Sequence, residues 1–170
     1  MPAEYLVISS SLRPGSLSRL LAQALVKELG KAAEWVDLRD YPLPICDGEA
    51  AYSDPNVAKL SAKISAARVI LVATPIYNFD ANAAVKNLVE LTGSAWENKI
   101  VGFACAAGGA LSYMSVMSLA NSLMLDFRCV ILPRFVYATG DDFADGKIAK
   151  PELTKRLKQL AEAATKLRYS

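Results

Sequence analysis

The residues of this chain best suited to chemistry form a serine-rich segment close to its start. Five serines and one arginine occur in the sequence Ser9-Ser10-Ser11-Leu12-Arg13-Pro14-Gly15-Ser16-Leu17-Ser18. Serine hydroxyls donate neutral hydrogen bonds, and the guanidinium of Arg13 is a planar charged fork that suits a phosphate. The segment follows a strand-like apolar run and precedes a helix-like one, which places backbone N–H groups and a helix N-terminus around an anion. We therefore predict a phosphomonoester site, although serine N-caps and a Pro-Gly turn would also explain these residues.

Two further segments carry residues suited to a ligand. The first, Thr74-Pro75-Ile76-Tyr77-Asn78-Phe79-Asp80, offers aromatic side chains and backbone amides to the face and edge of a flat heteroaromatic ring. The second contains Gly108 and Gly109, which let the backbone come close to a ligand. Each segment alone also fits an ordinary turn, with Tyr77 and Phe79 filling a core. A phosphate on the serine segment and a flat ring between these two would have the shape of FMN.

Histidine is absent from the chain. Its absence excludes Ser-His-Asp and Cys-His catalysis and most zinc sites. The chemistry must then come from carboxylates, Lys, Tyr, Ser or a cofactor. A phosphate-binding segment with few acid–base candidates favours a cofactor, so we predict no catalytic side chain and no metal ligand.

Apolar runs alternate with amphipathic segments along the whole sequence. The expected strands are residues 5–9, 34–38, 68–73, 99–106 and 130–138, and the expected helices are residues 17–29, 57–66, 83–92, 111–126 and 151–167. This alternation predicts one α/β domain over residues 1–170, a flavodoxin-like doubly wound sheet of five parallel strands in the order 2-1-3-4-5. Ligands of such sheets bind beyond the carboxyl ends of the strands, at the switch point between strands one and three.

Composition narrows the possible partners and the location. The chain has 19 Lys and Arg against 17 Asp and Glu, a balance that disfavours nucleic-acid binding and electrostatic attachment to membranes. No apolar run approaches the ~20 residues of a membrane span, and the start lacks a signal-peptide pattern. The cysteines lack C-x-x-C spacing and fit reduced thiols, with Cys105 and Cys129 buried and Cys46 in a loop. We expect a cytoplasmic protein.

The expected helix at residues 111–126 has apolar residues on almost every side and no charge before Asp126. A helix that covers one face of a sheet should have a polar outer stripe. Surfaces poor in charge and rich in Met and Tyr are typical of interface cores. The pattern predicts a homodimer or homotetramer, with Met114, Met117 and Asn121 at or near the contact.

Together, these motifs resemble those of the NAD(P)H-dependent FMN reductase family of flavodoxin-like proteins. The family pattern G-S-x-R-x-x-S-x-N is matched by Ser10, Ser11, Arg13, Ser16 and Ser18. The family pattern T-P-E-Y-N, followed by L-K-N, is matched by Thr74-Pro75-Ile76-Tyr77-Asn78 and Val85-Lys86-Asn87. Residues 37–44 and the Gly108-Gly109 pair are similar too. The chain departs from the family at Ser10, where glycine is usual, at Ser18, where asparagine is usual, and at Ile76, where glutamate is common.

The resemblance implies an FMN-dependent NAD(P)H oxidoreductase, with NADPH or NADH as co-substrate, that passes hydride through the flavin to free flavin, a quinone or another small acceptor. It implies cofactor contacts in three groups: Ser11, Arg13, Ser16, Leu17 and Ser18 around the phosphate; Pro75, Ile76, Tyr77, Asn78 and Phe79 along the isoalloxazine edge; and Gly108 and Gly109 at the pyrimidine end. Lys86 and Asn87 are expected to support the neighbouring loop instead of touching the ligand.

Other functions on the same scaffold stay open at this point. A quinone, azo-dye or metal-ion (chromate) reductase would use the same site. A non-enzymatic flavodoxin-like carrier is disfavoured by the near-neutral charge and by the lack of a T-x-T-G-x-T loop. A receiver domain would need carboxylates where this chain has serines. The sequence does not choose between NADH and NADPH, although Arg19, Arg39 and Arg134 are candidates for a 2′-phosphate.

Overall fold

Strands and helices alternate along residues 3–168, the part of the chain that the computed structural model describes. The main strands are β1 (Tyr5–Ser9), β2 (Ala33–Asp37), β3 (Val69–Tyr77), β5 (Ile100–Ala107), β6 (Val130–Ile131) and β7 (Val136–Thr139). The short strands are β4 (Asp80–Ala81), β8 (Phe143–Ala144) and β9 (Lys147–Ile148). The helices are α1 (Leu17–Leu29), α2 (Pro55–Ala66), α3 (Ala83–Thr92), α4 (Met117–Phe127) and α5 (Pro151–Lys166).

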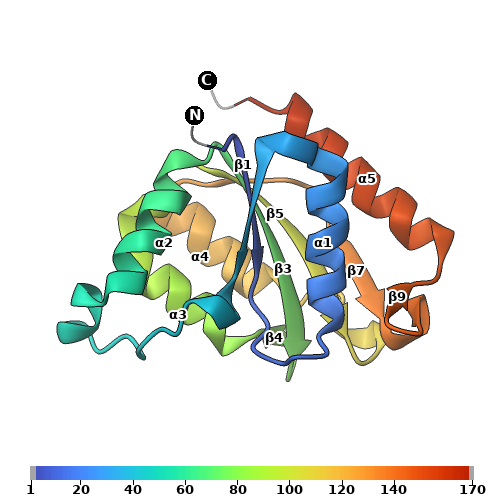
Figure 1. Ribbon diagram of the computed structural model, residues 1–170, viewed down its shortest axis with the longest axis horizontal. Helices are drawn as coiled ribbons and strands as arrows, with labels where there is room; N and C mark the ends of the chain where they lie inside the picture. The colour runs from blue at the N-terminus through green and yellow to red at the C-terminus, as the bar shows by residue number, and fades with distance from the viewer. Residues whose placement is uncertain (1–2, 169–170) are drawn as a thin grey trace.

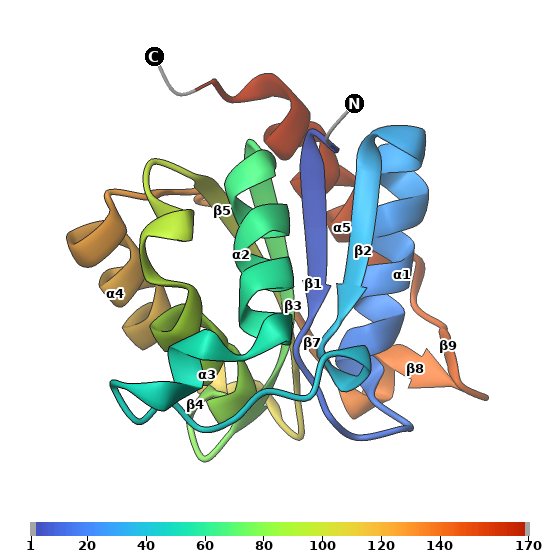
Figure 2. The ribbon, with the colours of Figure 1, turned by 60° about the vertical axis from the view of Figure 1, so that its left-hand side comes forward.

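The main strands form one parallel sheet in the order β2-β1-β3-β5, with β6 and β7 both paired to the outer edge of β5. Tyr5 is in register with Ala33 on one side and with Val69 on the other. Counting β6 and β7 as one interrupted strand, this is the predicted order 2-1-3-4-5. The carboxyl ends of the strands therefore meet at one edge, the lower edge in Figures 1 and 2.

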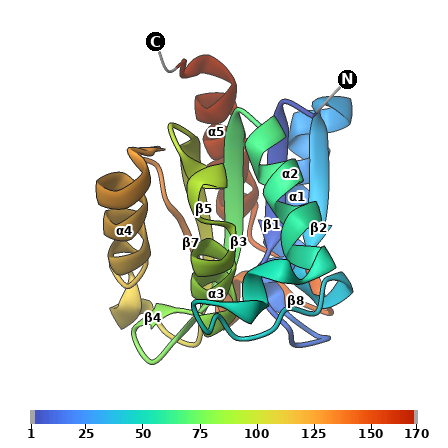
Figure 3. The ribbon, with the colours of Figure 1, turned by 90° about the vertical axis from the view of Figure 1, so that its left-hand side faces the viewer.

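Helices cover both faces of the sheet. Helices α1 and α5 lie on one face, and α2, α3 and α4 lie on the other (Figure 3). Alternate strand residues supply the two cores, so that Val7 and Leu71 pack toward α1 and α5 while Ile8 and Val72 pack toward the other helices. Burial on both faces explains why these strands are continuous apolar runs.

Gly102 in β5 allows α5 to approach the sheet. A Cβ at this position would lie 2.8 Å from a methyl carbon of Leu71 and 3.1 Å from one of Leu160. Such distances are too short for carbon atoms, so a larger residue would push α5 away. The glycine is therefore a packing requirement.

The predicted fifth strand, residues 130–138, is interrupted. Val101 pairs with Ile131 and Ala104 pairs with Val136, so residues 132–135 stand opposite only residues 102–103 of β5. Pro133 lies in this excursion and has no N–H to donate to a ladder. The prediction of one continuous strand was wrong because apolar content alone does not reveal a break in register.

Two other predicted elements also differ. Strand β3 continues to Tyr77, four residues beyond its predicted end, because β5 pairs with it as far as Pro75 and β4 pairs with its last two residues. Helix α4 begins at Met117 and not at residue 111; a short 3-10 turn, Ala110–Ser112, and a further bend precede it. The other predicted ends agree with the structure to within two residues.

Cysteine burial agrees with the prediction. Cys105 and Cys129 are buried, Cys46 is partly exposed in the segment after β2, and all three thiols are free. None of the helices in the described part of the chain combines the length and the apolar character needed to cross a bilayer.

Candidate active site

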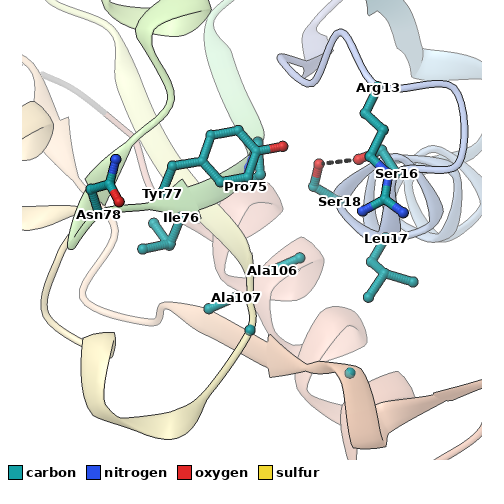
Figure 4. A pocket seen from close by; sticks show the side chains of 12 residues that line it. Arg13, Ser16, Leu17, Ser18, Pro75, Ile76, Tyr77, Asn78, Ala106 and Ala107 are labelled. Carbon is teal, nitrogen blue, oxygen red and sulfur yellow. Dashed lines mark hydrogen bonds between the residues drawn. The ribbon is translucent and has the colours of Figure 1, made fainter.

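A cavity of about 630 Å³ opens at the carboxyl edge of the sheet, between the start of α1 and the ends of β3, β5 and β7. This volume is typical of small-molecule sites. Its lining consists of Arg13, Ser16, Leu17, Ser18, Pro75, Ile76, Tyr77, Asn78, Ala106, Ala107, Gly108 and Gly140. Nine of these were predicted from the sequence, and the three predicted segments do converge on one cavity. Figure 4 shows Ser16, Ser18 and Arg13 on one side and Tyr77 with Asn78 on the other.

The first wall is the start of α1. Ser16 is the N-cap residue, yet its side chain caps no backbone N–H. Its hydroxyl instead lies 2.8 Å from that of Ser18. No acidic residue occupies the first turn of α1, so its unsatisfied N–H groups and the positive end of the helix dipole stay available to a ligand. Of the described residues that line the cavity, Arg13 alone is charged. These groups are donors matched to a phosphate.

Ser11, also predicted to bind the phosphate, lies outside the lining. It is buried, and its hydroxyl accepts a hydrogen bond of 3.3 Å from the backbone N–H of Arg13. Ser11 therefore shapes the loop that carries Arg13.

The second wall is the end of β3. Pro75 and Ile76 are strand residues here and not part of a loop, with Ile76 buried. Tyr77 is about half exposed at the mouth of the cavity, and Figure 4 shows its ring extended across the cavity toward Ser18. Asn78 and Phe79 form a two-residue turn between β3 and β4, both with left-handed backbone (φ +50° and +62°). Phe79 is not among the lining residues and is 67% exposed, so the prediction that it contacts the ligand ring finds no support in this cavity.

A buried amide joins the first two walls. The Asn82 carbonyl oxygen accepts hydrogen bonds from the hydroxyls of Ser10 (2.8 Å) and Thr74 (3.1 Å). The Asn82 amide nitrogen donates to the backbone oxygen of Ser10 (2.9 Å). The loop that carries Arg13 is thereby fixed to β3 and to the start of α3. Sequence reasoning missed Asn82, whose one visible signal was a polar residue just before a helix.

The third wall consists of Ala106, Ala107 and Gly108 at the end of β5, with Gly140 beyond β7. Their small size leaves the backbone exposed to the cavity. Ala106, Ala107 and Gly140 were not predicted, because residues that offer only backbone carry no chemical signal. Gly109 was predicted but lies outside the lining, and its carbonyl accepts a hydrogen bond from the Tyr137 hydroxyl.

The three arginines considered for a 2′-phosphate lie outside the lining, and each has a partner. Arg19 forms an ion pair with the buried Asp37 and stacks 5.7 Å from the ring centre of Trp35. Arg39 also pairs with Asp37, at 3.5 Å. Arg134 donates to Gln159 on α5. These contacts give the arginines structural roles.

Lys86 and Asn87 also lie away from the lining, as predicted. Lys86 pairs with Glu90 one helical turn later. Asn87 accepts from the N–H of Cys46 (2.9 Å) and donates to the carbonyl of Pro44 (2.8 Å). The loop that Asn87 supports is therefore the one after β2, and not the end of β3.

The lining limits the chemistry that the protein itself can do. The described lining residues include no carboxylate, thiol, lysine or histidine, the side chains that most often act as acids, bases or nucleophiles. What the cavity does offer is a group of hydrogen-bond donors at the start of α1, next to the ends of β3 and β5. On a flavodoxin-like sheet this combination suits a mononucleotide cofactor, as in the flavoprotein class.

Comparison with known proteins identifies the family. The family model described as NADPH-dependent FMN reductase matches residues 4–144. The chain belongs to this family and is an NAD(P)H-dependent flavin oxidoreductase that uses FMN.

Individual relatives agree with this assignment. An NAD(P)H-dependent FAD/FMN reductase of Geobacillus thermodenitrificans is 29% identical over 79% of this chain and 75% of its own length. An FMN reductase (NADPH) of Pseudomonas aeruginosa is 27% identical over 98% of this chain and 92% of its own length. The solved structure of FerB, a flavoenzyme NAD(P)H:(acceptor) oxidoreductase of Paracoccus denitrificans, matches the fold with a TM-score of 0.77. That match has 22% identity and covers 94% of this chain and 93% of FerB.

Proposed function

We propose that the cavity holds FMN with its phosphate at the start of α1 and its ring between the end of β3 and the end of β5. On this proposal the protein passes hydride equivalents from NADH or NADPH to a small acceptor such as free flavin or a quinone. The observation that carries the proposal is the uncapped N-terminus of α1, which shares one cavity with Arg13, Ser16 and Ser18.

Each group of residues has a distinct task in this proposal. The hydroxyls of Ser16 and Ser18 and the free N–H groups of α1 hold the phosphate, while Arg13 neutralises its charge. Pro75, Ile76 and Ala106 supply apolar walls that keep water from the ring. The half-exposed ring of Tyr77 offers a face on which a second planar molecule can stack. When bound, FMN supplies the two-electron chemistry that these side chains lack.

The proposal is tested with the purified protein and added FMN. We expect binding to perturb the visible spectrum of the flavin, and we expect oxidation of NADH or NADPH to depend on FMN. Oxidation of neither nicotinamide in the presence of FMN would overturn the proposal. Binding of FMN that stays oxidised in the presence of both nicotinamides would instead indicate a flavodoxin-like carrier, which needs a partner reductase.

The physiological acceptor is a separate question. The name of FerB leaves the acceptor general, and the half-exposed Tyr77 ring at the mouth does not single out one acceptor. A panel of free FMN, a quinone, an azo dye and chromate, assayed at equal NAD(P)H, would rank them. We expect planar organic acceptors to exceed chromate because the mouth carries aromatic and aliphatic side chains and no cation besides Arg13.

We further infer that the protein is a homodimer or homotetramer that associates through the outer surface of α4 and the segment before it. We call this surface the α4 patch. Its exposed large apolar residues are Leu111, Tyr113, Met114, Met124 and Leu125. An apolar surface of this kind is typical of an interaction site. Asn121, predicted near the contact, is exposed on α4, whereas Met117 is half-buried against the core.

We also infer a cytoplasmic location. Three free thiols, two of them buried without partners for a disulfide, suit a reducing compartment. Cell fractionation with an antibody against the chain would test this location.

A further inference from the structure

One buried hydroxyl holds the loop that follows β5. Tyr137 lies on β7, paired in register with Cys105, and its side chain is buried on the face covered by α4. Its hydroxyl donates to the carbonyl oxygen of Gly109 at 2.5 Å. It also lies 2.6 Å from the hydroxyl of Ser112. Because the phenol proton is used at Gly109, Ser112 must be the donor in the second bond.

The strand that carries Tyr137 is itself fixed. Arg156 on α5 donates to the backbone oxygen of Tyr137 at 3.3 Å and to that of Phe135 at 3.2 Å. These bonds satisfy two carbonyls of an edge strand and tie β7 to the helix layer. The backbone that carries the Tyr137 hydroxyl is therefore held in a fixed position.

The loop, residues 108–112, has little else to hold it. A Cβ at Gly108 or Gly109 would meet no atom within 4 Å, so no neighbour closes over either residue on the side where a side chain would lie. Leu111 is 92% exposed, and the 3-10 turn it belongs to has no side-chain cap. The contacts with Tyr137, including the edge-on ring of Tyr113 at 5.5 Å, are the anchors we find among the described residues.

We propose that Tyr137 is a positioning residue whose hydroxyl holds residues 108–112 in the conformation that forms the third wall of the cavity, and so controls binding of the flavin ring and its reduction potential. The inference rests on the proposed function, since Gly108 lines the cavity assigned to FMN. Holding the Gly109 carbonyl fixes the peptide plane between Gly109 and Ala110, because carbonyl and N–H of one peptide point in opposite directions. Gly108, the residue before the held carbonyl, lines the cavity, so the same bond limits where the backbone of Gly108 can lie beside the ring. Backbone N–H dipoles held toward a flavin ring would favour its reduced form, which gains electron density.

The test compares Tyr137→Phe with Tyr113→Phe. The first variant removes the hydroxyl that binds Gly109 and keeps the ring, and the second removes a hydroxyl from the adjacent ring. Without flavin, we expect amide hydrogen exchange in residues 108–112 to become faster in Tyr137→Phe but not in Tyr113→Phe. With flavin, FMN and riboflavin should both bind about three- to tenfold more weakly, the range for one lost hydrogen bond. If reduced flavin loses three- to tenfold more affinity than oxidised flavin, the two-electron potential becomes more negative by about 15–30 mV.

Unchanged loop exchange, affinities and potential in Tyr137→Phe would overturn the inference. Ser112→Ala, which leaves both rings in place, should shift the same three measurements in the same direction by a smaller amount, and it covers the case in which Tyr137→Phe does not fold. Failure of the wild-type protein to bind flavin would overturn the proposed function. The exchange measurement would still test whether Tyr137 holds the loop.

Discussion

A single charge, that of Arg13, should decide how the proposed phosphate end of the cavity distinguishes its ligands. Arg13 is the charged residue of the lining, so Arg13→Ala should weaken FMN binding by roughly 1.5–3 kcal/mol, the range for hydrogen bonds to charged groups. Riboflavin, which lacks the phosphate, should bind almost as before. Titration calorimetry with both flavins measures the difference. Arg134→Ala removes the same charge far from the cavity and is the control; equal losses for FMN and riboflavin in Arg13→Ala would show that Arg13 acts through folding.

A second residue-scale prediction concerns Cys105. Burial raises the pKa of its thiol from 9.0 to about 12. In the unfolded chain the thiol ionises near pH 9, but in the folded protein it stays protonated over the same range. The contribution of this thiol to the unfolding free energy is therefore complete below pH 9 and is lost between pH 9 and 12. From pH 8 to pH 10 the unfolding free energy of the wild type should fall by about 1.4 kcal/mol more than that of Cys105→Ala. Urea unfolding at the two pH values measures this; parallel behaviour of the two proteins would contradict it.

The lining residues that were easiest to predict from the sequence are those whose side chains have hydrogen-bonding or charged groups. Arg13, Ser16 and Ser18 have donors that suit a phosphate, and all three line the cavity. Ala107 and Gly140 line it too, but they offer only backbone, and their position follows from how far β5 extends and where the interrupted edge strand resumes. Apart from a glycine pair such as Gly108-Gly109, residue type does not signal such a role, so it emerges only from the assembled sheet.

At the scale of elements, the turn between β3 and β4 stores backbone strain. Phe79 has a φ of +62° and is 67% exposed, and a bulky residue in this left-handed region costs about 1–2 kcal/mol. Glycine adopts the region freely but loses more chain entropy on folding, by roughly 0.5–1 kcal/mol. Phe79→Gly should therefore raise the unfolding free energy by roughly 0.5–1 kcal/mol, measured by urea unfolding.

Asn78→Gly is the matched control for that substitution. Asn78 has a similar φ of +50°, but asparagine tolerates this conformation, so its replacement should gain less. A larger gain at Asn78 than at Phe79 would contradict the assignment of strain to the aromatic residue.

Elements that a local sequence pattern defines were predicted well, and elements whose ends depend on contacts with distant residues were predicted poorly. Helix α1 has its predicted ends because its apolar spacing and the serines before it are local signals. Strand β3 runs past its predicted end at residue 73 and through Pro75, because the partner strand β5 continues beside it. Helix α4 starts late because Ser112 is engaged with Tyr137, a contact between residues far apart in the sequence.

At the scale of the whole molecule, the alternation of apolar and amphipathic segments was sufficient to predict the strand order and the two helix layers. Helix α4 lies at the edge of the layer that it forms with α2 and α3, and its outer side faces away from the other described elements (Figure 3). Met114, Met124 and Leu125 are exposed there, without a charged side chain among residues 111–125. A monomer would leave this surface in water, which is the physical reason to expect a partner copy.

The last prediction tests that assembly. Met117 was predicted at or near the contact, but it packs partly on the core, so Met117→Glu would also destabilise the fold. Met114, 58% exposed, is the cleaner position. Light scattering at micromolar concentration should give a dimer or tetramer for the wild type and a smaller species for Met114→Glu, because an unpaired carboxylate would be buried in the contact.

The Met114→Glu variant should also retain flavin less well, since the α4 patch continues into the loop at the third wall of the cavity. Ile45→Glu, at an exposed apolar residue after β2, should leave the assembly intact, and a monomeric wild type would refute the interface.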